Sequence, residues 1–133
     1  MPLPDDDQHL NWNAQPIKVN IELNKNRTFW WKGRITYTDE DGVTTNVDLS
    51  DATTSAFVLE SPAGVDTTIA LTGLTADGKF AILVQPAHVA ALVASDYRYD
   101  CDIVLPAGNA TFPAGVSMRI FEGIATLYGE ISE

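Results

Sequence analysis

The sequence predicts an all-β protein, a sandwich of two sheets with about seven or eight strands and one short helix. Several segments alternate apolar and polar residues with a period of two, which is typical of strands that have one wet face. Turn signals rich in Gly, Pro, Asn and Asp recur about every eight to twelve residues. Only residues 86–94 have a helical pattern, and no apolar run approaches the length of a membrane span.

Length and composition indicate one folded domain. The chain has 133 residues, 45% of them hydrophobic, which is enough to bury a core. Its net charge of −10 disfavours nucleic acid and anionic membrane surfaces as partners, because both require clustered Lys and Arg. The single cysteine, Cys101, excludes an intrachain disulfide, and its apolar neighbours predict a buried thiol. We expect the chain to be made in a reducing cytoplasm.

Residues 1–16 are predicted to form an extended arm outside the sheets, and residues 17–133 to form the sandwich domain. The arm has two early prolines, an acidic run and no periodic pattern. Leu3, Leu10 and Trp12 nevertheless give it apolar surface, so they are candidates for contact with a partner protein. Two interpretations of Trp12 stay open: it folds back onto its own domain, or it anchors a neighbouring subunit.

The first two strands are predicted over residues 17–23 and 28–37. In the second of these, Trp31 falls on the face with the most apolar residues and is predicted to enter the core. Trp30 lies on the opposite face among charged residues. It is either packed under neighbouring Lys and Arg side chains or a contact residue on the surface, and we include it among the partner-contact candidates.

The middle of the chain is predicted to hold short strands over residues 43–49, 55–59 and 67–72, separated by turns. Residues 39–42, Asp-Glu-Asp-Gly, form an acidic hairpin loop. The loop lacks the spacing and the closing glutamate of a calcium-binding EF-hand, so we interpret it as a solvated turn.

The C-terminal half alternates most clearly. Pro86 is suited to the first turn of a short helix over residues 86–94. The strand that follows the helix is predicted to point every second residue toward the core. We expect Phe80, Ile82 and Val84, from the strand over residues 79–84, to lie near these core-facing residues. The core-facing set of the strand after the helix is Tyr97, Tyr99, Cys101, Ile103 and Leu105.

Two motifs in this half resemble a family of tailed-phage structural domains. In that family an immunoglobulin-like β-sandwich carries a Gly-x-Tyr-x-Tyr-Asp strand, followed by a final strand with Glu-Gly-x-x-x-Val. The resemblance is to the N-terminal modules of upper-baseplate and tail-fibre attachment proteins, and it implies an immunoglobulin-like β-sandwich here. The residues at the pattern positions are Tyr97, Tyr99, Asp100, Glu122 and Gly123.

This resemblance implies a non-enzymatic structural protein of a tailed-phage virion, made in the host cytoplasm. Such a protein would assemble in several copies with other virion proteins into the tail, baseplate or fibre, or would decorate the capsid. An alternative is a carbohydrate- or receptor-binding β-sandwich module that uses Trp30 as a stacking platform.

A third hypothesis is a hydrolase that uses Asp100 and Asp102, which would lie about 6–7 Å apart on one strand face. We expect both carboxylates to be solvated, and solvated carboxylates cannot supply the raised pKa that a general acid needs. The sequence has no P-loop, dinucleotide fingerprint or nucleophile elbow. We therefore expect no catalytic residue, no cofactor and no metal.

Overall fold

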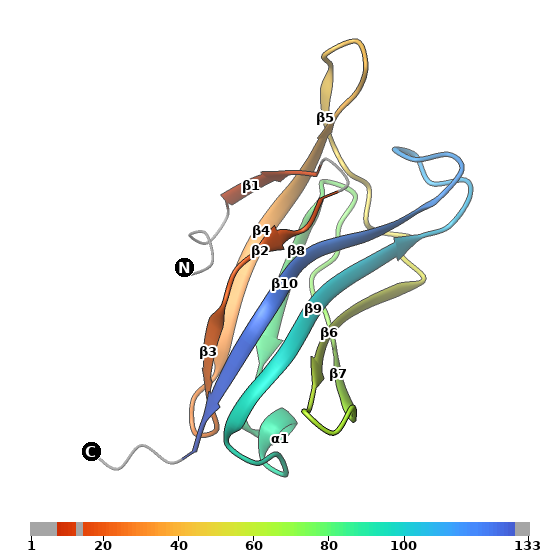
Figure 1. Ribbon diagram of the computed structural model, residues 1–133. Helices are drawn as coiled ribbons and strands as arrows, with labels where there is room; N and C mark the ends of the chain where they lie inside the picture. Colours follow the sequence, from red (N-terminus) through yellow and green to blue (C-terminus); the bar gives the residue numbers. More distant parts are fainter. Residues whose placement is uncertain (1–7, 13–14, 130–133) are drawn as a thin grey trace.

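The computed structural model describes residues 8–12 and 15–129, and it is a sandwich of two mixed sheets with one short helix, as predicted (Figure 1). The elements in chain order are β1 (Gln8–Asn11), β2 (Ile17–Lys18), β3 (Ile21–Asn24), β4 (Phe29–Thr38), β5 (Thr44–Asn46), β6 (Thr54–Glu60), β7 (Asp66–Ala70), β8 (Lys79–Val84), α1 (Pro86–Val89), β9 (Ser95–Leu105) and β10 (Val116–Tyr128).

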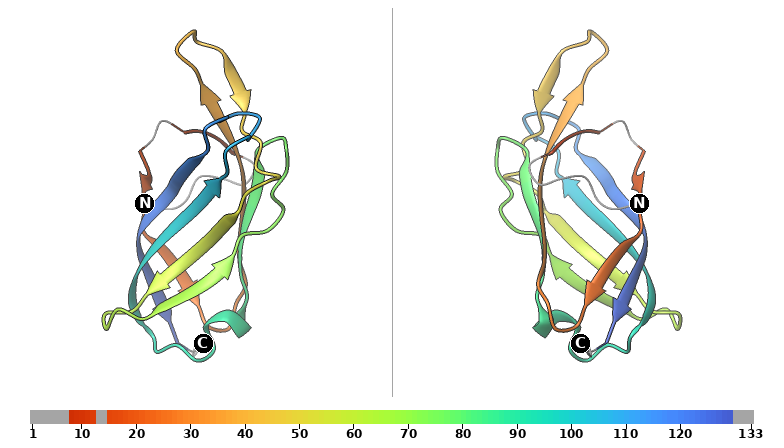
Figure 2. Two further views of the ribbon diagram at one scale, coloured as in Figure 1. Left: turned by 90° about the vertical axis from the view of Figure 1, so that its right-hand side faces the viewer. Right: turned by 90° about the vertical axis from the view of Figure 1, so that its left-hand side faces the viewer.

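The first sheet is built around β4, which pairs with β1, β5 and β8. The second sheet has the order β2–β10–β9–β6–β7, and β3 also pairs with β10. Three of the pairings are parallel, namely β1 with β4 and both β2 and β3 with β10. The N-terminal strands therefore contribute first to one sheet and then to the other, as the two side views in Figure 2 show.

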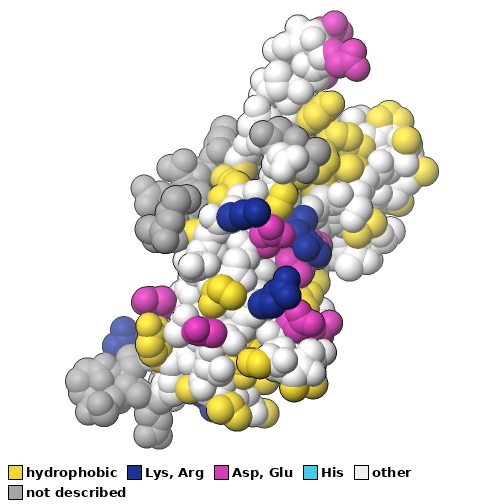
Figure 3. Space-filling view, in the orientation of Figure 1, with side chains coloured by type: hydrophobic (Ala, Val, Ile, Leu, Met, Phe, Trp, Pro, Cys, Tyr) yellow, Lys and Arg dark blue, Asp and Glu magenta, His cyan; other side chains and the backbone are white. Residues whose placement is uncertain are grey.

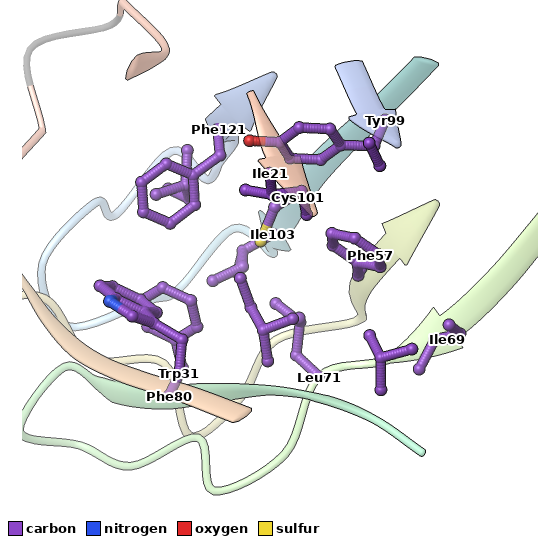
Figure 4. Packing of buried hydrophobic residues seen from close by; sticks show 14 of the residues in the cluster. Ile21, Trp31, Phe57, Ile69, Leu71, Phe80, Tyr99, Cys101, Ile103 and Phe121 are labelled. Carbon is purple, nitrogen blue, oxygen red and sulfur yellow. The ribbon is translucent and has the colours of Figure 1, made fainter. Parts of the chain in front are cut away.

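The core lies between the two sheets and is rich in aromatic side chains (Figure 4). Trp31 makes edge contacts with Phe80 and Phe121 at ring-centroid distances of 5.6 and 5.2 Å. The alternation predicted for β9 is confirmed, because its core-facing residues are all buried. Edge-to-face packing of this kind adds to the free energy gained by burying each ring.

The N-terminal arm departs from the prediction. Residues 8–11 form β1, which pairs in parallel with Gly33–Thr36 of β4, and the Trp12 amide donates to the Thr36 carbonyl at 2.8 Å. This part of the chain was expected outside the sheets, but burying Leu10, which is 8% exposed, and completing main-chain hydrogen bonds favour pairing. Leu3 lies outside the described residues.

The strand predicted over residues 17–23 is interrupted between β2 and β3. The Val19 amide donates to the Glu122 carbonyl at 3.0 Å, whereas the Ile124 amide donates to the side-chain oxygen of Asn20 at 3.0 Å. A Cβ at Gly123 would lie 2.2 Å from the Val19 carbonyl oxygen, so this close approach requires glycine. The interruption thus results from contacts with a strand far along the chain.

Helix α1 is shorter than predicted: it begins at Pro86 as expected but ends at Val89 rather than near residue 94. The Lys25 ammonium donates to the Leu92 carbonyl at 2.6 Å, and the Tyr97 hydroxyl donates to the Val93 carbonyl at 2.7 Å. These side chains satisfy carbonyl groups that a turn leaves open. Among the described residues, no helix is long and apolar enough to cross a membrane.

Strands β5 and β7 also differ in extent from the predicted ranges 43–49 and 67–72. After β5, Val47 and Leu49 are fully buried, and the Leu49 amide donates to the Thr75 carbonyl at 3.0 Å. The Val47 amide still donates to the Ile35 carbonyl of β4 at 3.0 Å, so the chain leaves β4 only after this residue. The hairpin formed by β4 and β5 projects beyond the sandwich (Figures 1 and 2).

Candidate functional site

A charged cleft of about 520 Å³ lies on the outer face of the second sheet. The polar residues of β9 and β10 line it because the alternate residues of those strands are buried in the core. Basic and acidic side chains are interleaved on the face of the molecule seen in Figure 3. The polar residues that line the cleft include Lys18, Asn20, Glu60, Arg98, Asp100, Arg119 and Glu122.

Arg119 holds three carboxylates at one side of this cleft. Its Nε donates to Asp102 at 2.9 Å, and its terminal nitrogens lie 3.6 Å from Asp100 and 3.6 Å from Glu122. Residues 119 and 102 are partners across β10 and β9, as are residues 122 and 100. The hydrogen bond to Asp102 and the nearby negative charge raise the pKa of Arg119, so its charge stays in place.

The expectation that both strand carboxylates are solvated is only partly met, because the side chains of Asp100 and Asp102 are each 29% exposed. Burial, followed by the hydrogen bond and charge of Asp102, raises the pKa of Asp100 to about 6, and the charge of Arg119 only partly opposes this. Both carboxylates nevertheless contact the same guanidinium. Among the described residues, no group of three or more His, Cys, Asp or Glu side chains could hold a metal ion.

A second surface, which we call the Trp30 groove, lies on the outer face of the first sheet. It has a volume of about 360 Å³ and is lined by residues that include Trp30, Lys32, Thr75, Lys79 and Leu83. Trp30 is 58% exposed, and the Lys32 ammonium lies 5.0 Å from the centroid of its ring. A lysine thus covers part of the indole, as one interpretation expected, and the remainder is accessible; a contact with a partner stays a prediction.

The Trp30 groove is basic. Lys79 of β8 is the register partner of Arg34 of β4, so two cations face each other across the sheet. The described residues that line the groove include no Asp or Glu. Sequence analysis identified Trp30 but missed Lys79, because only the pairing of β4 with β8 brings this lysine close.

Leu10 and Trp12 are engaged within the chain. Leu10 is buried in the core, and the Trp12 ring contacts Phe112 edge-on at a centroid distance of 5.8 Å. Phe112 also contacts Tyr37 at 4.8 Å, which fixes the indole against the first sheet. The fold-back interpretation of Trp12 is therefore the correct one for this structure. Of the sequence-predicted contact residues that are described, only Trp30 is largely exposed.

Comparison with known proteins adds a likeness of fold. No protein-family model matches the chain, and no curated protein sequence matches it. Among solved structures, the chain is similar to the N-terminal domain of phage TP901-1 ORF48, with 7% sequence identity and a TM-score of 0.48. The similarity covers 96% of this chain and 98% of that chain. At this identity and score the likeness carries no functional argument.

Proposed function

We propose that the chain is a non-enzymatic structural protein of a tailed-phage virion. It would assemble through protein–protein contacts into the tail, baseplate or fibre apparatus, or decorate the capsid. The phage assignment rests on the sequence motifs at Tyr97–Asp100 and at Glu122 and Gly123. The observation that carries the proposal is the pairing of these motifs, since Asp100 is the partner of Glu122 and Tyr99 the partner of Gly123.

These motif residues stabilise the fold. The Tyr99 hydroxyl donates to the Val19 carbonyl at 2.6 Å, and Gly123 makes room for that carbonyl. Asp100 and Glu122 both lie beside Arg119. A motif whose side chains are engaged in packing and ion pairing supports a structural role over a catalytic one, and it leaves the Trp30 groove available for contacts with other proteins.

The experiment that tests this proposal separates phage particles on a density gradient. Antibody against the chain should detect it in the particle fraction, and it should remain there after a high-salt wash. A chain found only among free soluble proteins of the lysate would contradict the proposal. A known particle protein and a known phage enzyme of the lysate serve as the two controls.

A carbohydrate- or receptor-binding module is the second candidate, favoured by the exposure of Trp30 in a groove. An accessible indole face can stack on a sugar ring. Saturable binding to a glycan panel that Trp30→Ala abolishes would support this candidate. Tyr128→Ala, which removes an exposed aromatic residue of the second sheet, is the matched control.

A further inference from the structure

The tip of the β4–β5 hairpin is acidic and exposed. It contains Asp39, Glu40 and Asp41, and Val43 beside them is 53% exposed. The Asp39 carboxylate accepts hydrogen bonds from the amides of Asp41 and Val43 at 2.9 Å each, so it shapes the turn. Glu40 and Asp41 are left to present charge to the outside, and acidic side chains mark the hairpin tip in Figure 3.

The Trp30 groove carries the opposite charge. Lys32 and Lys79 line it, and Arg34 lies opposite Lys79, so three of the chain's eight Lys and Arg residues gather on this sheet face. Like charges that face each other across a sheet repel, and a bound carboxylate removes that repulsion. The exposed part of the Trp30 ring adds an apolar surface on which a small aliphatic side chain can pack.

The hairpin tip cannot reach Trp30 of its own chain. Trp30 and Thr38 lie near opposite ends of the unbroken strand β4, which places them about 26 Å apart at a rise of about 3.3 Å per residue. The tip begins directly after Thr38. One end of the strand therefore carries the acidic tip, whereas Trp30 lies near the other end, and Arg34 with its partner Lys79 lies near the middle.

We propose that the hairpin tip of one copy docks in the Trp30 groove of a second copy. Glu40 and Asp41 meet the cations of the groove, and Val43 packs on Trp30. The contact is head-to-tail, so it propagates into a ring where the rotation closes and into a filament where it does not. This inference rests on the proposed function, because it supplies the contact by which several copies assemble. A two-stranded hairpin is only marginally stable alone, and docking holds it in place.

Charge reversal at the two surfaces tests the contact by sedimentation velocity. The tip variant carries Glu40→Lys and Asp41→Lys, and the groove variant carries Lys79→Glu. Wild-type chain should associate as its concentration rises, and each variant alone should associate at least about tenfold more weakly. An equimolar mixture should form pairs, because the unchanged tip of the groove variant fits the unchanged groove of the tip variant. Glu22→Lys and Arg27→Glu are matched charge controls, and melting temperatures report whether each variant is folded.

Several results would overturn this contact. Wild-type chain that stays monomeric up to about 1 mM has no such contact of useful affinity. The tip variant is compared with a variant in which Asp5, Asp6 and Asp7 are changed to Asn. If the tip variant still associates and this second variant does not, the N-terminal segment binds the groove instead of the hairpin tip. A mixture that fails to associate excludes direct pairing of tip and groove. Absence of the chain from phage particles would contradict the proposed function. It would not decide whether the tip binds the groove, which the sedimentation experiment tests separately.

Discussion

The Tyr99 hydroxyl lies 2.6 Å from the carbonyl oxygen of Val19, and this buried hydrogen bond connects β9 to the segment between β2 and β3. Strand β10 lies between the two, and Gly123 is the residue of β10 that pairs with Tyr99. A side chain at position 123 would collide with the Val19 carbonyl. One tyrosine, one glycine and one carbonyl group thus join three strands of the second sheet.

Tyr99→Phe is expected to lower the free energy of unfolding by about 1–2 kcal/mol, because the Val19 carbonyl loses its buried donor. Tyr99→Ala also removes the ring and should cost about 3–5 kcal/mol. Tyr97→Phe is the control: that hydroxyl bonds to the carbonyl of Val93, an exposed residue that water can reach, so its loss should cost less. Urea denaturation measures all three, and equal losses for the two Phe variants would contradict the account.

Gly123→Ala is expected to destabilise the chain by about 2 kcal/mol or more, since the added Cβ would lie 2.2 Å from the Val19 carbonyl oxygen. Gly129→Ala is the control, because a Cβ there would have its nearest neighbour at the ordinary distance of 3.6 Å. Thermal denaturation of the two variants provides the measurement. A melting temperature for Gly123→Ala equal to that of Gly129→Ala would show that β10 and the Val19 segment are not in this close contact.

The core-facing residues of β9, and the burial of Trp31, could be predicted because the alternation of apolar and polar residues is a local signal. The path of residues 17–24 was not predictable, because the break in that strand depends on contacts with residues 104 positions away. Asn20 accepts from the Ile124 amide, and the Val19 carbonyl packs against Gly123. Strand β1 was missed for the same reason. Its four residues contain a single buried apolar side chain, Leu10, and its partner is the edge of a strand that sequence analysis cannot place beside it.

An arm outside the sheets could be removed without loss of stability, whereas β1 cannot. Leu10→Ala is expected to lower the free energy of unfolding by about 2 kcal/mol, because it empties a buried site. Asn11→Ala is the control, since Asn11 is exposed and its side chain donates to the exposed Thr38 hydroxyl; it should cost less than about 0.5 kcal/mol. Chemical denaturation of both variants decides the matter. Equal stability of Leu10→Ala and wild type would show that residues 8–12 form an arm outside the sheets.

Asp100 should make stability depend on pH. Its pKa is raised to about 6 in the folded chain, mainly by burial, against about 3.9 in an unfolded chain. The folded chain therefore binds more protons between those values, and the free energy of unfolding falls as pH rises from about 4 to about 6.

The variant Asp100→Asn removes this titration. It should match wild type near pH 4 and exceed it at pH 7.5 by on the order of 1 kcal/mol, after allowance for solvent screening. Asp77→Asn, in an exposed turn, is the control. A difference between Asp100→Asn and wild type that stays constant across this pH range would show that Asp100 is solvated, as the sequence alone had indicated.

The candidate surfaces were predictable only in part. Trp30 stood out as a large aromatic residue on the charged face of a strand, and it is exposed in the structure. The basic character of its surroundings depends on the register of β4 with β8, which places Lys79 opposite Arg34. The grouping of Asp100, Asp102 and Glu122 around Arg119 depends in the same way on the register of β9 with β10. Sequence periodicity reports which face a residue occupies but not which residue lies beside it.

Electron cryo-microscopy of intact phage particles tests the central claim most directly. The account predicts density for this two-sheet sandwich, with its projecting β4–β5 hairpin, at repeated positions in the tail, baseplate, fibre or capsid surface. The repeated copies should be in contact with other virion proteins. Complete, infectious particles that show no such density, from cells in which the chain stays among the free proteins of the lysate, would contradict the account.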